Sequence, residues 1–323
     1  MKQENEPTIH KELRISAIFI KFFLPSFKAN TVQLANTFLS TLKGKCKSKL
    51  YYEQRYIKRP DGTDLRITIY APILRKPSAA GLVWFHGGGY GMGTPEMNEK
   101  LFKKIIDRTG CVIISPDYRL SVEKPYPAAI DDCYTTLKWV KEYGKEYMIN
   151  INQIMVGGES AGGGLTAAIT HMARDKGEVN IAYQIPLYPM IDDRMITESA
   201  KDNLLDPIWN SRSNYEGWKL YLGDLFGSNK VPVYAAPARA ENFESLPPCL
   251  TYVGSVEPFL DETKAYVSAL EKANVPVDFK VFDGGFHAFD TIGGNSTIAK
   301  EAIEFLLTHI EHATKKYYKE NKD

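Results

Sequence analysis

The sequence lacks any run of about 18 apolar residues, so it predicts no integral membrane segment. Its net charge is only +1, from 40 Lys and Arg against 39 Asp and Glu, and no long basic stripe crosses it. This balance argues against nucleic acid as a partner. Neither a G-x-G-x-x-G pattern nor a Walker-type phosphate loop is present, and there are no internal repeats. These absences disfavour membrane-spanning, nucleic-acid-binding, common nucleotide-binding and repeat proteins.

Cysteine and histidine are scarce. The four cysteines fit no zinc-binding spacing, and nothing else indicates an oxidising compartment. They are Cys46, Cys111, Cys133 and Cys249, and we interpret the last three as small core residues. His309 and His312 are three apart on a predicted helix but lack a third ligand, so we interpret them as part of a solvated face. We therefore expect no metal and no organic cofactor.

The N-terminal region is apolar at helical spacing. Residues 15–24 form the best candidate for a secretory signal, but the stretch is short, is broken by Lys21 and lacks a convincing cleavage site. We interpret it as not a signal peptide and expect a cytoplasmic protein. Across residues 8–46, Pro25 divides two predicted helices. They fit either an amphipathic segment on a membrane surface or, the interpretation we favour, a cap over the domain that follows.

From Lys49 onward the pattern changes to strands and helices. Residues 51–57 and 64–71 alternate in polarity around a Pro-Asp-Gly turn, which predicts an antiparallel hairpin. The elements that follow are strand 81–86, helix 96–109, strand 111–116, helix 127–143, strand 153–158, helix 161–175 and strand 181–188. This alternation predicts an α/β fold with a mostly parallel, doubly wound sheet. Ligands bind such sheets at the carboxyl ends of the strands.

A Gly-x-Ser-x-Gly motif is formed by Gly158, Ser160 and Gly162. A strand-like run precedes it and a helix-like run of small residues follows, which is the setting of a nucleophile elbow. So tight a turn strains the serine backbone and needs small residues on either side. It also directs the free N–H groups of the helix start toward charge that forms beside the serine. The motif predicts a nucleophile, but its short pattern also arises by chance.

A glycine-rich loop about seventy residues earlier strengthens this prediction. The buried-strand run 81–85 ends in His86, Gly87, Gly88 and Gly89. Glycines allow a loop whose backbone amides point inward and donate to an oxyanion. A loop of this kind and a nucleophile elbow two strand-helix units later form a far more specific pair than either motif alone.

A carboxylate and a histidine follow the last predicted strands. Glu257 follows the strand-like run that begins at Cys249, and His287 lies on a loop after strand 277–282. The chain order serine, acid, histidine is the order found in α/β-hydrolases. Asp261 is a second candidate for the acid. Two more distant choices are Asp283 and Asp290.

The chain resembles the hormone-sensitive-lipase family of α/β-hydrolase carboxylesterases and, within that comparison, is similar to arylacetamide deacetylases. Five stretches carry the resemblance, in the family's order over roughly residues 80–290: 86–90, 117–120 with 125–133, 158–163, 257–262 and 287–289. There are two departures. The family usually has aspartate where Glu257 stands and often has asparagine where Gly164 stands. The second we expect to change local packing only.

The resemblance implies a core and a helical cap. We expect the α/β-hydrolase core over 49–189 and 238–323, cap helices within 1–48, and a second part of the cap at 190–237. This last segment interrupts the strand-helix alternation, and so long an irregular segment is usually functional. Four of its aromatic residues are spaced like one helical face, and we interpret them as packing the cap onto the core: Trp209, Tyr215, Trp218 and Tyr221.

The resemblance also assigns roles. Ser160 is the nucleophile, and His287 is the base that later protonates the leaving alcohol. The carboxylate orients the histidine ring. We prefer Glu257 for this, because it ends the strand and matches the family position, whereas Asp261 begins the next helix.

The oxyanion needs backbone donors. The amide of Ala161 directly follows the nucleophile, and the resemblance favours Gly88 and Gly89 as the others. Gly87 then shapes the turn and His86 holds the loop. Asp117 and Arg119 we interpret as structural residues that tie down the loop after their strand.

Together these parts predict a serine carboxylic ester hydrolase that works through an acyl-enzyme and takes a small-molecule ester. By family analogy we expect short acyl groups. An amidase or deacetylase with the same triad is the close alternative. A non-catalytic ligand-binding protein is the alternative from another class, since the family includes a hormone receptor that lost the histidine; His287 argues against it. Whether the chain forms a homodimer stays open.

Overall fold

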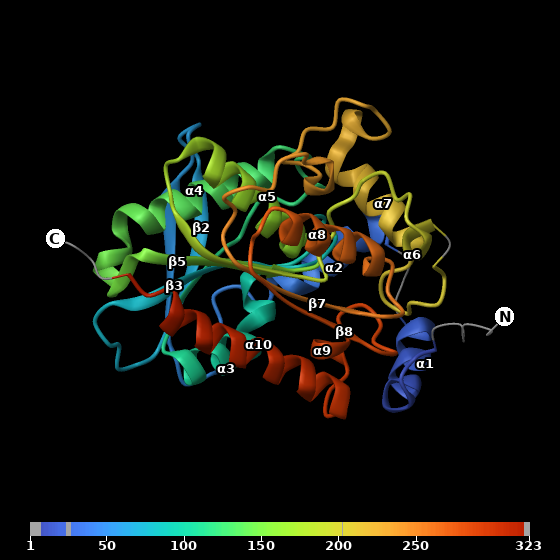
Figure 1. Ribbon diagram of the computed structural model, residues 1–323, viewed down its shortest axis with the longest axis horizontal. Coiled ribbons are helices and arrows are strands. Elements are labelled where there is room, and N and C mark those ends of the chain that lie inside the picture. Colours follow the sequence, from blue (N-terminus) through green and yellow to red (C-terminus); the bar gives the residue numbers. More distant parts are fainter. Residues whose placement is uncertain (1–7, 24–26, 202, 320–323) are drawn as a thin grey trace.

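The computed structural model describes residues 8–23, 27–201 and 203–319, and an eight-stranded sheet runs through it between layers of helices (Figure 1). The strand order is β1-β2-β4-β3-β5-β6-β7-β8. The strands are β1 (Tyr51–Lys58), β2 (Asp64–Ala71), β3 (Ala79–Phe85), β4 (Val112–Pro116), β5 (Ile149–Glu159), β6 (Ile181–Leu187), β7 (Cys249–Gly254) and β8 (Val277–Phe282).

Most neighbouring strands run parallel. β1 and β2 form the predicted antiparallel hairpin, and β2 also pairs antiparallel with β4. The other neighbours pair in parallel, so the predicted mostly parallel α/β sheet is confirmed. Side chains alternate across it: Val83 and Phe85 enter one core layer, while Leu82 and Trp84 enter the other. This two-sided burial explains why the central strands read as continuous apolar runs.

Helices cover both faces of the sheet. The long ones are α3 (Glu99–Thr109), α4 (Ala128–Tyr143), α5 (Ala161–Lys176), α8 (Leu260–Lys272) and α10 (Thr297–Lys316). α4, α5 and α8 lie over one face, and α3 and α10 lie together over the other (Figure 1). Cys111, Cys133 and Cys249 are fully buried, as the sequence predicts for core residues.

The remaining helices gather at the end of the sheet where the parallel strands have their carboxyl ends (Figure 1). They are α1 (Arg14–Phe23) and α2 (Ala29–Ser40) from the N-terminal region, α6 (Glu198–Lys201) and α7 (Ser211–Leu222) from the long insertion, and the short α9 (Phe289–Ile292). Residues 1–7 of the expected cap and Pro25, its expected helix boundary, lie outside the described residues.

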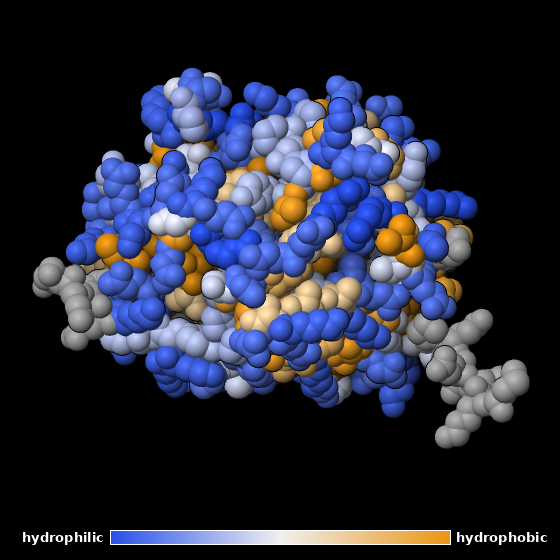
Figure 2. Space-filling view, turned by 45° about the horizontal axis from the view of Figure 1, so that its top comes forward, coloured by the Kyte–Doolittle hydropathy of each residue, from blue (hydrophilic) through white to orange (hydrophobic). Residues whose placement is uncertain are grey.

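Helix α1 has apolar residues both on the side that faces the core and on the side that is exposed. Ala17 faces the core, whereas Ile15 and Ile18 are about 70% exposed. Even so, no helix within the described ranges is long and apolar enough to cross a membrane. The face of the molecule shown in Figure 2 is mostly hydrophilic, with apolar side chains in small groups between polar ones.

The aromatic residues of the insertion do not share one helical face. α7 begins at Ser211, so Trp209 lies before the helix, and Tyr215 is half exposed. The predicted common face is therefore wrong for these two. Trp218 and Tyr221 are buried, and Tyr221 stacks on Tyr90 of the glycine-rich loop with ring centroids 3.7 Å apart. Trp209 is buried as well, so all of these aromatic residues except Tyr215 pack the insertion onto the core as expected.

Candidate active site

Ser160 stands on a sharp turn between β5 and α5. Its backbone has φ 59° and ψ −120°, a strained conformation for a residue with a side chain. Its N–H donates to Leu187 O at 3.0 Å, which fixes the turn against the next strand. A Cβ on Gly158 or Gly162 would collide with the carbonyl oxygen of Phe85 at the end of β3. Both glycines of the motif are therefore needed for the turn to approach the sheet.

A chain of hydrogen bonds joins the three predicted triad residues. His287 Nε2 lies 2.8 Å from Ser160 Oγ, and His287 Nδ1 lies 2.6 Å from Glu257 Oε2. The second carboxylate oxygen of Glu257 accepts the Gly254 N–H at 2.8 Å. The three side chains come from the ends of β5, β7 and β8, because parallel strands bring their carboxyl ends to one edge.

The other candidate acids have different partners. Asp261 accepts the backbone N–H of Ser199 in α6. Asp283 accepts the hydroxyl of Ser255. Asp290 is buried and accepts the hydroxyls of Tyr188 and Tyr252, at 3.0 and 2.6 Å for the closer oxygens. The structure thus brings Glu257 to the histidine ring and engages these three aspartates elsewhere.

Burial governs the ionisation of the triad. Burial lowers the pKa of His287 to about 4. It also raises the pKa of Glu257 above its ordinary value, although the hydrogen bond from the Gly254 N–H acts in the opposite direction. His287 is consequently neutral near pH 7. A neutral ring can accept the serine proton on Nε2 while its Nδ1–H donates to Glu257.

The glycine-rich loop presents backbone amides beside the serine. Gly88 has φ +116° and Gly89 has φ +58°, and a Cβ on Gly88 would overlap the carbonyl of Met92. Within the described ranges, the N–H groups of Gly88, Gly89 and Ala161 have no hydrogen-bond acceptor. Free amides of this kind are what a developing oxyanion requires.

Glu159, which the sequence analysis did not single out, ties the elbow to this loop. Its carboxylate accepts the Gly87 N–H at 2.9 Å, the Asn98 amide at 2.8 Å and the Trp84 indole N–H at 2.7 Å. Burial raises its pKa to about 7. Because Glu159 directly precedes Ser160, the nucleophile and the oxyanion donors share one support.

His86 shapes the loop from inside. Its ring is fully buried and stacks on Tyr118 with centroids 4.2 Å apart. A Cβ on Gly93 would collide with that ring, so the loop folds back directly over it. Burial lowers the pKa of His86 to about 4, which keeps it neutral. These contacts fit the loop-holding part that the sequence suggests for it.

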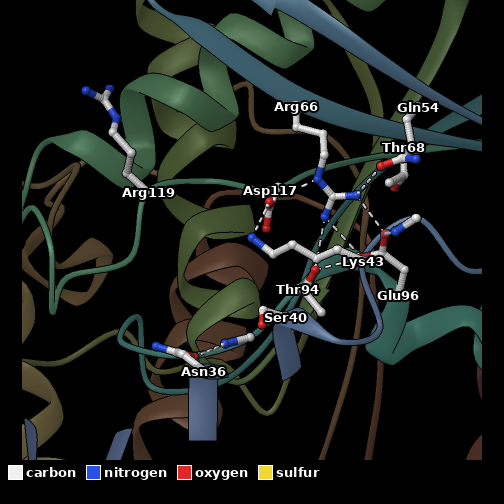
Figure 3. A network of polar contacts seen from close by, with 12 residues as sticks. Asn36, Ser40, Lys43, Gln54, Arg66, Thr68, Thr94, Glu96, Asp117 and Arg119 are labelled. Carbon is white, nitrogen blue, oxygen red and sulfur yellow. Dashed lines mark hydrogen bonds and ion pairs between the residues drawn. The ribbon is translucent and has the colours of Figure 1, made fainter. Parts of the chain in front are cut away.

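A buried ion network anchors the segment that follows the loop (Figure 3). Arg66 of β2 bonds Glu96 at 2.7 Å and Asp117 at 3.0 Å and also reaches Thr94. Lys43 adds a second cation to Asp117 at 2.7 Å. Asp117 thus ties down the loop after its strand, as predicted.

Arg119 lies apart from this network (Figure 3) and makes its own paired contact with Asp132. The guanidinium donates through two nitrogens, at 3.0 and 2.8 Å, to a carboxylate that is fully buried. The backbone N–H of Arg119 donates to the same carboxylate at 2.9 Å. Arg119 therefore fixes the loop after β4 to helix α4, again in keeping with a structural part.

Helix α2 and the residue Phe27 just before it contact the glycine-rich loop directly. Asn36 of α2 donates to Gly91 O at 3.0 Å and accepts the Gly93 N–H at 3.2 Å. Phe27, just before α2, packs edge-to-face on Trp209 with centroids 4.7 Å apart. A Cβ on Gly89 would overlap the ring of Trp209. Residues from both expected parts of the cap therefore cover the oxyanion loop.

The insertion also reaches the acid and histidine loops. Asn203 donates its amide to Val256 O at 2.6 Å, next to Glu257. Asp206 accepts the backbone N–H of His287, also at 2.6 Å. Neither residue is predicted from the sequence. They lie in an irregular segment, and their partners are 53 and 81 residues away, so no local pattern marks them.

The surroundings of Gly164 leave no room for the asparagine that the family often has at this position. A Cβ at this position would overlap both the Met190 carbonyl and the Tyr90 hydroxyl. Those two groups are hydrogen-bonded to each other at 2.8 Å and occupy the space of a side chain. The expected change in local packing is therefore that Tyr90 of the glycine-rich loop fills the space a side chain at position 164 would take.

We expect Gly164→Asn to lower the free energy of unfolding by about 1–3 kcal/mol, because it overpacks this contact. Urea unfolding of Gly164→Asn, Tyr90→Phe and the double variant measures the effect. The double variant should lose less than the sum of the two single losses, since the hydroxyl overlap is gone. Additive losses, or a stable Gly164→Asn, would contradict this explanation.

No metal site accompanies these residues. In the part of the chain that the structure describes, no group of three or more His, Cys, Asp or Glu side chains is arranged to hold a metal ion. The chemistry open to the site is attack by an activated hydroxyl with stabilisation of an oxyanion by amides.

Comparison with known proteins identifies a family and named relatives for this chain. The family model for proteins with the alpha/beta hydrolase fold matches residues 82–291. The Mycobacterium tuberculosis protein named esterase LipI is 33% identical over 221 residues, which cover 68% of this chain and 69% of that protein. An arylesterase of Saccharolobus solfataricus is 32% identical over 235 residues, or 70% of this chain and 73% of that protein.

Solved structures match over almost the whole chain. A bacterial heroin esterase superposes with a TM-score of 0.86 at 28% identity, covering 95% of this chain and 98% of that one. One of two fungal esterases from Rhizomucor miehei superposes with a TM-score of 0.85 at 24% identity, over 97% of this chain and all of that one. The second likeness bears on the fold alone.

Proposed function

Because this chain belongs to the alpha/beta hydrolase family whose model spans residues 82–291, we propose that it hydrolyses carboxylic esters with short acyl groups. It is a serine ester hydrolase, as its esterase and carboxylesterase relatives indicate. The observation that carries the residue assignment is the hydrogen-bonded series Ser160, His287 and Glu257 beside three free amides.

The proposed mechanism has two halves. His287 Nε2 takes the hydroxyl proton as Ser160 Oγ attacks the ester carbonyl, and the oxyanion is held by the amides of Gly88, Gly89 and Ala161. The imidazolium then protonates the departing alcohol, leaving an acyl-serine. Water, activated by the same ring, attacks the acyl carbon and releases the acid. Glu257 keeps Nδ1–H oriented throughout and stabilises the charged ring.

Trp209 supports the preference for short acyl groups. Its ring is 4% exposed and lies against Gly89, and its centroid is 6.4 Å from that of His287. An acyl group whose carbonyl oxygen sits at the glycine amides has this indole beside it. A bulky, immobile wall there limits the chain length that fits.

We expect the protein to cleave p-nitrophenyl acetate and butyrate with much higher kcat/KM than the octanoate and palmitate. Trp209→Ala should raise the octanoate-to-acetate ratio of kcat/KM by about 10-fold or more, since each methylene is worth roughly a factor of 10 or more in an apolar pocket. Trp139→Ala, an aromatic truncation on α4 beside Tyr143 and Tyr147, is the matched control.

Two results would contradict the proposal at different levels. A wild-type preference for octanoate or palmitate would refute the short acyl pocket, but the protein would still be an ester hydrolase. Failure of the folded protein to cleave any of the four esters would refute the ester substrate itself. Turnover of p-nitroacetanilide in that case would favour the amidase alternative.

A further inference from the structure

A buried carboxylate of the insertion lies behind the histidine loop. Asp206 is 1% exposed, and its Oδ2 accepts the backbone N–H of His287 at 2.6 Å. Its Oδ1 accepts the backbone N–H groups of Ile208 and Trp209 at 2.8 and 2.9 Å. One side chain therefore holds the loop that carries the histidine and the loop that carries the indole beside it.

All three donors to Asp206 are neutral amides. In the described ranges it forms no ion pair with lysine or arginine, unlike Asp193 of the same insertion, which pairs with Arg239 at 2.7 Å. A carboxylate that is hydrogen-bonded but not neutralised keeps its field inside a low-dielectric interior. The nearest group that can gain a positive charge during turnover is His287.

Three buried carboxylates face His287 from different elements. Glu257 contacts the ring, Asp206 contacts the backbone, and Asp290 of α9 is held by the hydroxyls of Tyr188 and Tyr252. Burial is the largest influence on the pKa of His287 and lowers it, whereas the negative charge of Asp206 raises it. Burial in turn raises the pKa of Asp206 to about 6, so it is ionised at pH 8.

We propose that Asp206 is a positioning residue for the ester hydrolysis proposed above: it fixes the histidine loop and favours the protonated ring formed during turnover. It touches neither substrate nor the reacting atoms and acts through His287. The inference rests on the proposed function, because it concerns the same histidine. The insertion then has two roles: Trp209 forms a wall of the site, and Asp206 supports the catalytic base His287.

The test compares Asp206→Asn with Asp193→Asn. Both substitutions remove a buried carboxylate from the same insertion, and only the first loses a contact with the triad. We expect Asp206→Asn to lower kcat for p-nitrophenyl acetate by about 10- to 100-fold, the range for losing a hydrogen bond to a charged group, with little change in KM. Asp193→Asn should keep kcat within about threefold of the wild type.

The pH profile separates positioning from a merely structural part. His287 must be neutral to accept the serine proton, so activity falls where the ring becomes protonated. As the pH falls, Asp206, with a pKa of about 6, becomes protonated before His287, with a pKa of about 4. Wild-type kcat/KM should therefore begin to fall near pH 6, where the negative charge that favours the protonated ring is lost. Without that charge the limb should move to lower pH while the plateau falls. Loss of packing alone lowers the plateau and leaves the limb in place.

Asp206→Glu keeps the charge and guards against a misfolded Asp206→Asn. Its acid limb should stay with that of the wild type, whatever the height of its plateau. Wild-type kcat in a folded Asp206→Asn, a lowered plateau with an unmoved limb, or an Asp206→Glu limb shifted to lower pH would each overturn the inference. If the wild type itself hydrolyses no ester, the proposed function has failed, which is a separate result.

Discussion

Ser160→Ala is expected to lower kcat for p-nitrophenyl acetate by roughly 10⁴- to 10⁶-fold, the loss typical when the nucleophile of a serine triad is removed. The physical reason is that the covalent route disappears. His287 Nε2 then has no hydroxyl at 2.8 Å to deprotonate, and the residual rate comes from the amides and binding alone. Steady-state hydrolysis of the short esters measures the effect.

The fold should survive this substitution. Ser160 makes its turn-defining contacts through the backbone: its N–H donates to Leu187 O, and its carbonyl accepts from Gly164 and Met190. Alanine keeps all three contacts and still has to adopt φ 59°. Circular dichroism and labelling with a fluorophosphonate provide the controls. A folded Ser160→Ala protein that keeps more than a tenth of the activity would show that another residue is the nucleophile.

The second large effect separates two acids that lie four positions apart. We expect Glu257→Gln to lower kcat by about 10³- to 10⁴-fold, because the amide no longer selects the Nδ1–H tautomer or stabilises the imidazolium. Asp261→Asn should stay within about threefold of the wild type, since Asp261 bonds Ser199 in α6 and not the ring. Ester hydrolysis by both variants, with thermal unfolding to verify the fold, gives the comparison.

The two variants control for each other. Both remove one negative charge, and both keep the size of the side chain. Their positions differ in the contact that matters, 2.6 Å to His287 Nδ1 for Glu257 and 2.9 Å to a backbone amide for Asp261. A large loss in Asp261→Asn with an active Glu257→Gln would reverse the assignment of the acid.

The sequence predicts those parts of the site that depend on local backbone. The elbow at Ser160 needs glycines at fixed offsets, and the oxyanion loop needs consecutive glycines after a strand, so both leave short motifs. The sheet is predictable for a related reason. Strands buried on both faces, such as β3 and β4, are nearly continuous apolar runs separated by amphipathic helices.

The supports of the site could not be predicted in this way. Asn36, Glu159 and Asp206 are single polar residues whose partners lie 55, 72 and 81 positions away. Their function follows from three-dimensional proximity, which no spacing rule encodes. The common helical face predicted for the aromatic residues of the insertion is wrong for a similar reason. A periodic spacing from Trp209 to Tyr221 did not reveal that α7 begins only at Ser211.

Polar contacts join the outer segments of the chain to all three catalytic loops, so the two parts cannot be exchanged independently. Asn36 holds the oxyanion loop, Asn203 the acid loop and Asp206 the histidine loop, and each does so through backbone groups of the core. Any descendant or engineered hybrid that exchanges these outer segments must resupply matching donors and acceptors for all three loops. Substrate range and catalytic competence are therefore inherited together in this chain, because the segments that enclose the site also brace it.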